Sequence, residues 1–580
     1  MKSQLEHLSK IAVITDPDNT IDAVSSMMTL RSGDKRHTGL AFVVEQNGRF
    51  LGILSESDVR RTRSRNISFT RPVREAMNSE PLTLPARTPN TQIVTEIYHR
   101  LSELTQSEGT YLRHIPMLDD SGVLIDVLDV LDLLKHQNDS PRRIAVIGMG
   151  YVGLTLSVSL ASRGHIVTGV DVQHDLVRQL MEGRPHVHEP GLREMLDATL
   201  ACQLITFHTS LNDCSHDVYI IAVGTPLDQG GKPDLSALHE VTIAIGPHLR
   251  HGDLVMLRST VPTGTTRNMV VQQLEALSGL TAGEEFHVAF APERTIEGRA
   301  MYELCSLPQV LGGLSSACLL KAAMFWSTVT PSIIQVASLE ASELVKLANN
   351  TFRDLSFAFA NEVALLADAS NINAFELLQA ANAGYQRNPI PLPSPGVGGY
   401  CLTKDPLLYG YSPTGVSSDA TLGIAGRRIN EKAGRYPLEI IKRYANRIGA
   451  KLHELTVVVI GIAFKGEPET SDVRGSVALD VIGALDDLVS KVVVWDAVID
   501  HQELIRLGLD AVTDWHNADH HADVILILNN HRSNVDAVSS MLDHSPLLIF
   551  DGWNQLNPAD VECIPGLTYA TMGYMTKHEQ

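Results

Sequence analysis

Short apolar runs, each followed by glycine or a polar turn, recur along most of the chain. One run, Ile144–Ile147, precedes Gly148, and a stretch with helical spacing follows from Leu154 to Ser162. Gly164–Asp171 then has the composition of a second strand. Strands that alternate with helices are typical of parallel sheets buried on both faces. This part of the chain is therefore predicted to form an α/β domain.

A second block of the same kind occupies the C-terminal part of the chain. Its predicted parallel strands are Val457–Ile460, Lys491–Trp495, Val524–Leu528 and Leu547–Phe550. Between the two blocks, Ala337–Ser370 has helical spacing and no proline. The residues on or near its apolar face are Leu344, Leu347, Phe352 and Leu355. The pattern predicts one long helix that connects two α/β domains.

Two polar breaks indicate where the domains end. The segment 136–143 is polar and contains a proline, and the segment 447–453 precedes the second block of strands. With 580 residues, the chain is too long for a single hydrophobic core. We expect four parts, which are residues 1–138, 142–335, 336–450 and 451–580.

The N-terminal part contains a weak internal repeat. Gly48–Asp58 aligns with Gly122–Asp132, and each copy has the pattern of a strand followed by the start of a helix. We therefore expect two related α+β units before the first α/β domain.

Composition and charge narrow the classes of function. Hydrophobic residues make up 44% of the chain and charged residues 20%, as in ordinary globular proteins. The net charge of −20 argues against nucleic acid or an anionic membrane surface as the partner. No apolar stretch is long enough to span a bilayer, and residues 1–10 lack the apolar core of a secretory leader, so a cytoplasmic location is expected. The six cysteines form no CxxC pair and no zinc-like cluster, so no metal site is predicted.

The strongest local motif is a glycine-rich turn. Gly148, Gly150 and Gly153 have the spacing G-x-G-x-x-G between a predicted strand and a predicted helix. Glycines at these positions allow a tight turn, a close approach of the backbone to a pyrophosphate, and close packing of the helix. Asp171 ends the next strand, 23 residues after Gly148. It favours NAD over NADP, because a carboxylate with no arginine after it repels a 2′-phosphate.

Six further motifs follow in order along the chain. They are Gly224–Leu227 with Gly231–Asp234, Arg258–Thr265, Ala291–Arg299, Ala341–Asn350, Gly396–Pro406 and Gly461–Arg474. This series resembles the UDP-glucose/GDP-mannose dehydrogenase family across residues 142–575. The resemblance implies an α/β protein with two doubly wound, Rossmann-like domains, one for NAD and one for a UDP-sugar. It also implies that the long central helix joins these domains and forms the core of a homodimer.

The resemblance implies a four-electron oxidation, in which the C6 alcohol of a UDP-hexose becomes a carboxylate and two NAD⁺ are used. It assigns the central step to Cys401. A thiolate adds to the intermediate aldehyde, a second hydride transfer converts the thiohemiacetal into a thioester, and water hydrolyses the thioester. Gly396, Gly398 and Gly399 lack side chains, so the backbone beside Cys401 can approach a ligand closely.

Other roles carry over from the resemblance by position. Asp405 matches the carboxylate that helps to activate the hydrolytic water. Lys346 and Asn350, spaced i, i+4 on one helix face, match the pair that stabilises the oxyanion and positions this water. Thr260 and Glu293 match residues at the cofactor and the catalytic water. Further cofactor contacts are expected at Tyr151, Val152, Thr225 and Arg474, and substrate contacts at Glu297, Gly398 and Lys465.

The resemblance also bears on the substrate. Pro292–Gly298 and Phe464–Thr470 are more similar to the branch that acts on N-acetylated UDP-hexosamines, such as UDP-ManNAc and UDP-GlcNAc, than to the UDP-glucose branch. The products of such enzymes serve surface polysaccharide biosynthesis. Tyr400 and Leu176 depart from residues that are common in the family.

A hydroxyacid dehydrogenase of similar layout is a weaker interpretation of the whole chain, because such an enzyme has no use for Cys401.

The N-terminal repeat resembles a tandem CBS pair over residues 8–136. Ser55 and Asp58 match the positions that contact the phosphates and the ribose of an adenine nucleotide in such pairs. In the second copy Asp126 and Asp129 replace Gly52 and Ser55, and added carboxylates repel phosphates. We expect at most one nucleotide site in this CBS pair. A CBS pair that serves only in assembly and binds no nucleotide is an equal alternative. A nucleotide sensor with an inactive dehydrogenase half is the alternative to an active enzyme.

Overall fold

The computed structural model describes most of the chain in two compact units. The described residues are 13–29, 40–55, 58–59, 61–62, 67–88, 114–129, 141–211, 215–330, 332–385, 387–411, 421–512, 522–542 and 547–576. One unit comprises residues 1–141 together with 315–328, which include helix α12 (Ser316–Trp326). The other comprises residues 142–314 and 329–580. The predicted linker residues 136–140 and the last residue of the predicted repeat, Asp132, lie outside the described residues.

The first unit contains two three-stranded sheets with the same connectivity. Its elements are β1 (Val13–Thr15), α2 (Ile21–Thr29), β2 (Leu40–Val44), β3 (Phe50–Ser55), β4 (Leu84–Pro85), β5 (His114–Leu118) and β6 (Leu124–Asp129). In each sheet the first strand is parallel to the second, and the second is antiparallel to the third. The register shifts at the matching place, after Val43 in one sheet and after Met117 in the other. The predicted repeat is therefore present as two copies of one strand arrangement.

Gly52 shows where the two copies differ. The amide of Asn78 donates to the carbonyl of Ile53 at 2.8 Å, so the backbone of the segment after β3 lies against this strand. A Cβ atom at Gly52 would overlap the carbonyl oxygen of Asn78. Asp126, which pairs with Met117 across the second sheet, has a side chain at the matching position. The segment Pro72–Pro81 contains a 3₁₀ turn, Val73–Glu75, and two isolated bridges, at Pro72 and at Asn78.

The first α/β domain has the strand order of a dinucleotide-binding fold. Its strands are β7 (Arg143–Ile147), β8 (Ile166–Val170), β9 (Ile205–His208), β10 (Val218–Ile221), β11 (Leu254–Leu257), β12 (His287–Phe290), β13 (Gln309–Gly313) and β14 (Ile333–Gln335). Its helices are α6 (Tyr151–Ala161), α7 (His174–Met181), α8 (Leu192–Ala201), α9 (Ser236–Ile245), α10 (Gln272–Ser278) and α11 (Ala300–Ser306). The sheet runs β14-β13-β12-β11-β10-β7-β8-β9, and only β12 and β13 are antiparallel. Counted from β7, strands β7 to β12 have the order 3-2-1-4-5-6 of a doubly wound sheet.

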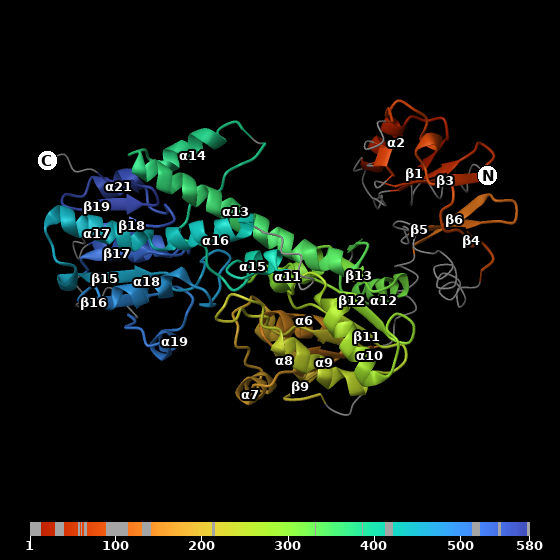
Figure 1. Cartoon of the computed structure of the whole chain (residues 1–580), viewed down its shortest axis with the longest axis horizontal. Coiled ribbons are helices and arrows are strands. Elements are labelled where there is room, and N and C mark those ends of the chain that lie inside the picture. The colour runs from red at the N-terminus through yellow and green to blue at the C-terminus, as the bar shows by residue number, and fades with distance from the viewer. Residues whose placement is uncertain are drawn as a thin grey trace. The chain divides into compact units, whose positions relative to one another are not determined.

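Helix α13 (Leu339–Ala369) is the longest element of the second unit. It spans 31 residues and begins at Ser338, whose side chain accepts a hydrogen bond from the amide of Ala341. It contacts β12 and β13 of the first α/β domain near its start, and it continues toward the C-terminal domain (Figure 1). The helices that follow are α14 (Ala374–Asn382), α15 (Asp405–Gly410), α16 (Thr421–Gly434) and α17 (Tyr436–Ile448). The predicted connecting helix is confirmed.

The predicted apolar face of α13 is in fact divided between two sides of the helix. Leu347 is fully buried, whereas Phe352 is 74% exposed and Leu344 is also exposed. Phe359 and Leu366 continue this exposed row at a spacing of seven residues. An apolar stripe along α13 is therefore uncovered in the single chain.

The C-terminal domain is built on a second sheet, which is parallel except at its last strand. Its strands are β15 (Thr456–Ile460), β16 (Lys491–Trp495), β17 (Val524–Ile527), β18 (Leu548–Asp551), β19 (Thr568–Thr571) and β20 (Tyr574–Met575), in the order β16-β15-β17-β18-β19-β20. Its helices are α18 (Val477–Leu485), α19 (His501–Arg506), α20 (Asn534–Met541) and α21 (Pro558–Glu562). The four predicted strands are confirmed. Strands β19 and β20 were not predicted, because neither contains a long apolar run.

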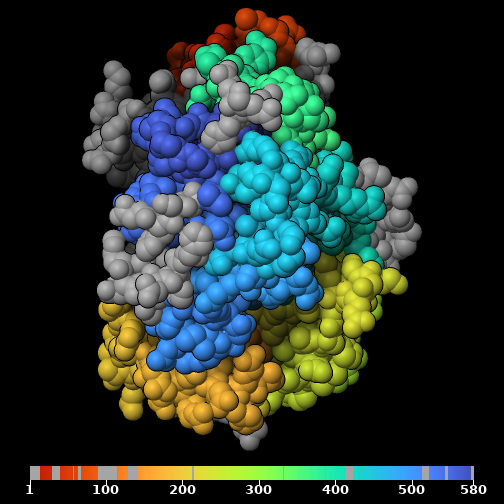
Figure 2. Space-filling model, turned by 90° about the vertical axis from the view of Figure 1, so that its left-hand side faces the viewer, coloured from red at the N-terminus to blue at the C-terminus, as the bar shows by residue number. Residues whose placement is uncertain are grey.

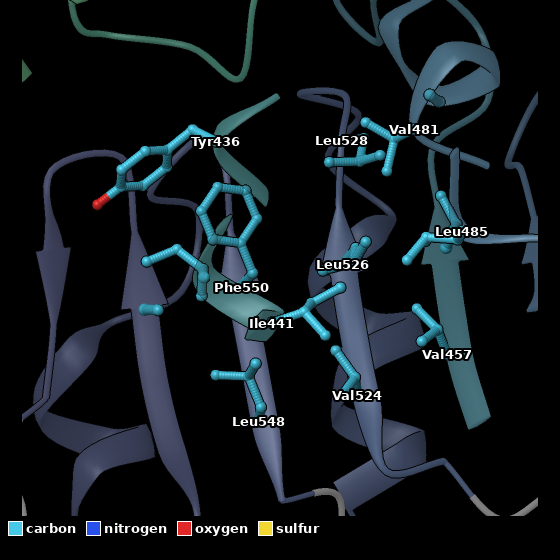
Figure 3. Packing of buried hydrophobic residues seen from close by; sticks show 14 of the residues in the cluster. Tyr436, Ile441, Val457, Val481, Leu485, Val524, Leu526, Leu528, Leu548 and Phe550 are labelled. Atoms are coloured by element: carbon cyan, nitrogen blue, oxygen red, sulfur yellow. The ribbon is translucent and has the colours of Figure 1, made fainter. Parts of the chain in front are cut away.

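The core of the C-terminal domain explains the apolar runs of its strands. One face of the sheet presents Val457, Leu526 and Phe550, and Figure 3 shows these side chains close to Ile441 of α17 and Val481 of α18. Burying an aliphatic or aromatic side chain of this size stabilises a fold by about 1.5–3 kcal/mol.

Among the residues that the structure describes, no helix is both long enough and apolar enough to cross a bilayer.

Candidate active site

A cavity of about 490 Å³ opens where four parts of the second unit meet. Its walls come from the strand ends of the first α/β domain, from α13, from the segment 398–404 and from the C-terminal domain. In the space-filling view, the C-terminal domain (light to dark blue) lies directly against the first α/β domain (orange to yellow) (Figure 2). The cavity adjoins the loops after β7 and β10, where the strand order of the sheet reverses. Ligands of doubly wound sheets bind at this point.

The glycine turn after β7 fits a dinucleotide. Gly148 has a φ of 96°, which L residues with side chains rarely adopt. A Cβ atom at Gly153 would overlap the carbonyl oxygen of Gly148, whereas one at Gly150 would meet no atom within 4 Å. Helix α6 begins at Tyr151, earlier than predicted, and its N-cap Gly150 provides no side-chain cap. The first amides of α6 are therefore available to a pyrophosphate.

Asp171 stands at the end of β8 beside this turn. Its two carboxylate oxygens accept hydrogen bonds from the amides of Met149, at 2.8 Å, and Gln173, at 3.0 Å. These bonds hold the carboxylate at the edge of the glycine turn, where a ribose would lie. The predicted cofactor residues Gly148, Gly153 and Asp171 are thus brought together.

The hydroxyl group of Tyr151 is committed to a contact within the protein. It hydrogen-bonds the carboxylate of Glu189, and the amide of Gly298 donates to both groups, at 3.0 Å to Tyr151 and 2.8 Å to Glu189. Burial and then the bond to Glu189 raise the pKa of Tyr151. Glu189, which no sequence motif singled out, joins the start of α6 to the loop around Gly298.

Cys401 lines the cavity at the end of a glycine-containing loop. A Cβ atom at Gly399 would lie 2.7 Å from the ring of Phe464, and one at Gly398 would lie 2.5 Å from the carbonyl oxygen of Gly475. These glycines were expected to let the backbone approach a ligand. The structure shows that they also let this loop approach the C-terminal domain.

A buried ion pair supports the loop that precedes Cys401. Arg427 of α16 pairs with Asp354 of α13 at 2.6 Å, and both side chains are almost fully buried. Arg427 also donates to the carbonyl of Val397 at 3.3 Å, and Asn430 donates to Asp354 at 2.9 Å. This pair was not predicted, since neither residue belongs to a local motif.

Asn350 and Asp405 meet as predicted, but with a further partner. The side-chain amide of Asn350 donates to one carboxylate oxygen of Asp405 at 2.6 Å. Lys404, which was not predicted, donates to the other oxygen at 2.8 Å. Asp405 is 0% exposed and does not line the cavity, whereas Asn350, Lys404 and Lys346 do. Any influence of Asp405 on a water molecule in the cavity therefore passes through its two partners.

The charges around Cys401 act on its thiol in opposite directions. Burial raises the pKa of the thiol above its ordinary value, and Asp405 adds to this rise. Lys346 opposes it most strongly among the neighbouring cations, because an ammonium group stabilises the thiolate. The net effect of these groups favours the thiol over the thiolate in the ligand-free protein.

The rate at which Cys401 is alkylated will show how these charges set the pKa of its thiol. In the ligand-free protein its rate with iodoacetamide will rise with pH and reach half its maximum above the ordinary thiol pKa, because only the thiolate reacts. Lys346→Met will move this midpoint further upward, and Lys451→Met, at an exposed surface site, will leave it in place. Peptide mass spectrometry distinguishes Cys401 from the exposed Cys202 and Cys563. A midpoint at or below the ordinary thiol pKa would contradict this account.

Glu293 is held by several donors of the protein. Arg258 donates to one carboxylate oxygen at 2.9 Å, and the amides of Arg294 and Thr295 donate to the other at 2.7 Å each. Burial raises the pKa of Glu293, but the charge of Arg258 and the bond from Thr295 outweigh burial and lower it. The expected contact of Glu293 with a catalytic water thus competes with these bonds.

Thr260 and Thr225 line the cavity together. The hydroxyl group of Thr225 donates to the carbonyl of Thr260 at 2.5 Å, which ties the loops after β10 and β11 to each other. Val152 lines the same wall of the cavity.

A cluster of charged groups forms the wall nearest the C-terminal domain. Lys465 donates to the carbonyl of Glu297 at 2.8 Å, and Arg474 lies 3.7 Å from the carboxylate of Glu297. Burial raises the pKa of Glu297 to about 7, and Asp472 adds to this rise, while Lys465 and Arg474 oppose it. Arg353 lines this wall as well. The cations give this end of the cavity the charge that phosphate groups require.

The candidate nucleotide residues of the first unit are bonded to each other. Asp58 accepts hydrogen bonds from the amide and the hydroxyl of Ser55, at 2.8 and 2.6 Å, and its own amide donates to the Ser55 hydroxyl at 3.2 Å. Arg61 pairs with the remaining carboxylate oxygen. This arrangement is a capping box at the start of a helix. The Ser-x-x-Asp pattern therefore has a structural role that needs no ligand.

Comparison with protein families identifies the parts of the chain. Residues 142–329, 340–432 and 458–558 match the NAD binding domain, the central domain and the UDP binding domain of the UDP-glucose/GDP-mannose dehydrogenase family. Residues 6–65 match the CBS domain.

Individual relatives agree with this assignment. The chain is 34% identical to UDP-N-acetyl-D-mannosamine dehydrogenase of Pyrococcus horikoshii over 375 residues, which is 64% of this chain and 88% of the relative. It is 31% identical to NDP-N-acetyl-D-galactosaminuronic acid dehydrogenase of Ralstonia solanacearum, over 67% of this chain and 91% of the relative.

Solved structures with the same fold include two nucleotide-sugar dehydrogenases. The structure of UDP-D-ManNAc dehydrogenase from Pyrococcus horikoshii matches with a TM-score of 0.66 and 31% identity, over 74% of this chain and 99% of the other. The structure of a UDP-glucose dehydrogenase from Pyrobaculum islandicum matches with a TM-score of 0.61 and 29% identity, over 69% of this chain and 92% of the other.

Proposed function

Because the chain belongs to the UDP-glucose/GDP-mannose dehydrogenase family and is an NAD-dependent nucleotide-sugar dehydrogenase, we propose that it oxidises the C6 alcohol of a UDP-hexose to a carboxylate through Cys401. The observation that carries this proposal is the place of Cys401. It lines one cavity with the glycine turn after β7, with Lys346 of α13 and with Lys465 of the C-terminal domain. A sugar between these groups would have its C6 close to both the thiol and the cofactor.

The proposed covalent step uses the thiol as a nucleophile. The sulfur of Cys401 adds to the C6 aldehyde, and the aldehyde oxygen accepts the proton to give a thiohemiacetal. Oxidation of this adduct gives a thioester, and water then releases the carboxylate and restores the thiol. Lys346 lines the cavity with Cys401, so its charge stabilises the thiolate and the developing oxyanion.

The proposed cofactor residues supply binding and orientation. NAD⁺ bound there would accept one hydride in each of the two oxidation steps. The glycine turn and the first amides of α6 would hold its pyrophosphate, Asp171 would hold a ribose, and Arg474 would contribute a positive charge. Asn350 and Lys404 would place the hydrolytic water while Asp405 fixes both side chains.

We propose an N-acetylated UDP-hexosamine as the substrate, with UDP-ManNAc as the first choice. Several of the similar proteins are dehydrogenases of N-acetylated sugar nucleotides, and the motifs around Glu297 and Lys465 favour the same branch. Uronates of this type are building units of surface polysaccharides. Glu297, Gly398 and Lys465 are the proposed contacts of the sugar nucleotide.

A substrate panel tests this proposal. Purified protein with NAD⁺ and either UDP-ManNAc, UDP-GlcNAc or UDP-glucose will yield two NADH for each sugar oxidised, with the highest kcat/KM for UDP-ManNAc. Absorbance of NADH and chromatography of the uronate measure the two quantities independently. One NADH per sugar would exclude the four-electron reaction, and a preference for UDP-glucose would exclude the proposed substrate while retaining the enzyme.

The N-terminal unit and the stripe on α13 point to partners. An adenine nucleotide is the proposed ligand of the CBS module, and titration of ATP, ADP and AMP against NADH output tests it. Because Ser55 and Asp58 bond each other, a flat response would leave this module with a role in assembly.

A second copy of the chain is proposed to cover the exposed stripe of Leu344, Phe352, Phe359 and Leu366, as a homodimer or part of a higher homo-oligomer.

A further inference from the structure

The ring of Tyr400, the residue directly before Cys401, is in contact with two cations. The guanidinium carbon of Arg474 lies 4.8 Å from the ring centroid, and the ammonium nitrogen of Lys404 lies 5.1 Å from it. Both distances are within the range in which an aromatic ring attracts a cation. Tyr400 lines the cavity together with both of these residues.

Each of these cations belongs to an ion pair with a different place in the cavity. Arg474 donates from Nε and Nη2 to the carboxylate of Asp472, at 2.9 and 2.6 Å, on the wall that faces the C-terminal domain. Lys404 is paired with Asp405 beneath Cys401. The ring of Tyr400 therefore contacts one member of each of these two ion pairs.

The far end of Tyr400 reaches the first α/β domain. A Cβ atom at Gly224 would lie 3.1 Å from the Tyr400 hydroxyl oxygen, so the ring passes close over the loop that follows β10. This loop also contains Thr225, which lies 3.5 Å from Lys404. Tyr400 thus touches the cofactor-binding domain, the cysteine loop and the arginine of the C-terminal domain.

The bonds of Arg474 leave part of its guanidinium group available. Asp472 engages Nε and Nη2, and among the described residues no hydrogen bond engages Nη1. The side chain is about half exposed, and Asp472 holds it from one edge of the guanidinium group. The face of the Tyr400 ring provides a second contact without occupying any donor of the guanidinium group.

We propose that Tyr400 is a positioning residue for the cofactor. Its ring holds the guanidinium group of Arg474 toward the pyrophosphate of NAD, beside the first amides of α6, and keeps Lys404 directed at Asp405. Its effect is on the affinity for the dinucleotide more than on the affinity for the UDP-sugar. This assignment rests on the proposed function, since it takes the cavity as the site of NAD and of the sugar nucleotide.

Variants of Tyr400 test the ring directly. Tyr400→Leu removes the π system, and the dissociation constant for NADH, measured by fluorescence titration without any sugar nucleotide, will rise about tenfold. Tyr400→Phe retains the ring and will stay within about twofold of the parent. Under turnover, the KM for NAD⁺ will rise in Tyr400→Leu while the KM for the UDP-sugar stays within about twofold, because the ring acts on Arg474.

A double-mutant cycle separates positioning from a general structural role. Arg474→Ala alone will weaken NADH binding, and adding Tyr400→Leu will weaken it no further, because the ring acts through the arginine. Tyr400→Met provides a second variant without a ring in case the leucine variant unfolds early, and urea unfolding checks both.

Several results would overturn the proposal. They are an unchanged NADH affinity in both ringless variants, a loss in Tyr400→Phe as large as that in Tyr400→Leu, and additive losses in the double variant. A rise in the KM for the UDP-sugar as large as that for NAD⁺ would contradict the proposed selectivity of Tyr400 for the cofactor. A parent protein that oxidises no UDP-sugar would refute the proposed function, while the NADH titrations would still decide the role of Tyr400.

Discussion

Cys401→Ser will reduce uronate formation by about 10⁴-fold or more, because removal of a covalent nucleophile has effects of this size. A serine hydroxyl group remains protonated at neutral pH and adds poorly to an aldehyde, and it offers no route to a thioester. The cavity will otherwise be retained, since serine is no larger than cysteine. The hydrogen bonds that Lys404 and Asp405 donate to Cys401 go to its backbone carbonyl, which the substitution leaves in place. Uronate measured by chromatography, together with NADH absorbance, provides the readout.

The matched control for this variant is Cys202→Ser. Cys202 is an exposed cysteine at the end of α8 and does not line the cavity, so its replacement will leave the rate unchanged. A Cys401→Ser protein that formed uronate at the parent rate would remove this residue from the mechanism. NADH titration of the same variant will give the parent affinity, which shows that the loss lies in the chemistry.

Gly153→Ala is expected to have the second largest effect, and its cause is packing. A Cβ atom at this position would overlap the carbonyl oxygen of Gly148, so the turn that holds the pyrophosphate must move. We expect a loss of about 1–3 kcal/mol in the free energy of unfolding, as for other overpacked positions. The affinity for NADH will fall by about a hundredfold or more, because the amides of the turn no longer converge on one point.

Gly150→Ala is the matched comparison, because it lies in the same turn. A Cβ atom there would meet no protein atom within 4 Å, so the unfolding midpoint in urea will equal that of the parent. It would nevertheless extend into the cavity and weaken NADH binding. Parent stability in Gly153→Ala, or a large loss of stability in Gly150→Ala, would contradict this explanation of the two glycines.

Local features of the structure were predictable where they depend on nearby residues. The strands β7, β15, β16, β17 and β18 were predicted because a buried parallel strand needs an apolar run. The glycine turn and Asp171 were predictable because a tight turn and a strand-end acid have fixed spacing. The capping box of Ser55 and Asp58 also follows a local rule, Ser-x-x-Asp, which was interpreted as a nucleotide site.

Contacts between distant segments could not be predicted in the same way. Lys404 and Asp405 are adjacent in the chain, but only the approach of α13 shows that Asn350 completes their pair. Arg258 and Glu293 are 35 residues apart and share one buried ion pair. No periodicity relates such partners, because their distance is set by the packing of strands and helices.

By itself, the sequence determined the α/β class, the long connecting helix and the glycine turn, because each depends on residue type and short spacing. Cys401 is the proposed nucleophile because of the resemblance of six ordered motifs to one family. Only the tertiary structure decided which groups surround that cysteine. It placed Lys404 on Asp405, the ring of Tyr400 against Arg474, and the pair of Arg427 and Asp354 beneath the cysteine loop. The physical reason is that charges, rings and close backbone contacts act over a few ångströms in space, and the chain brings together residues that are far apart in its order.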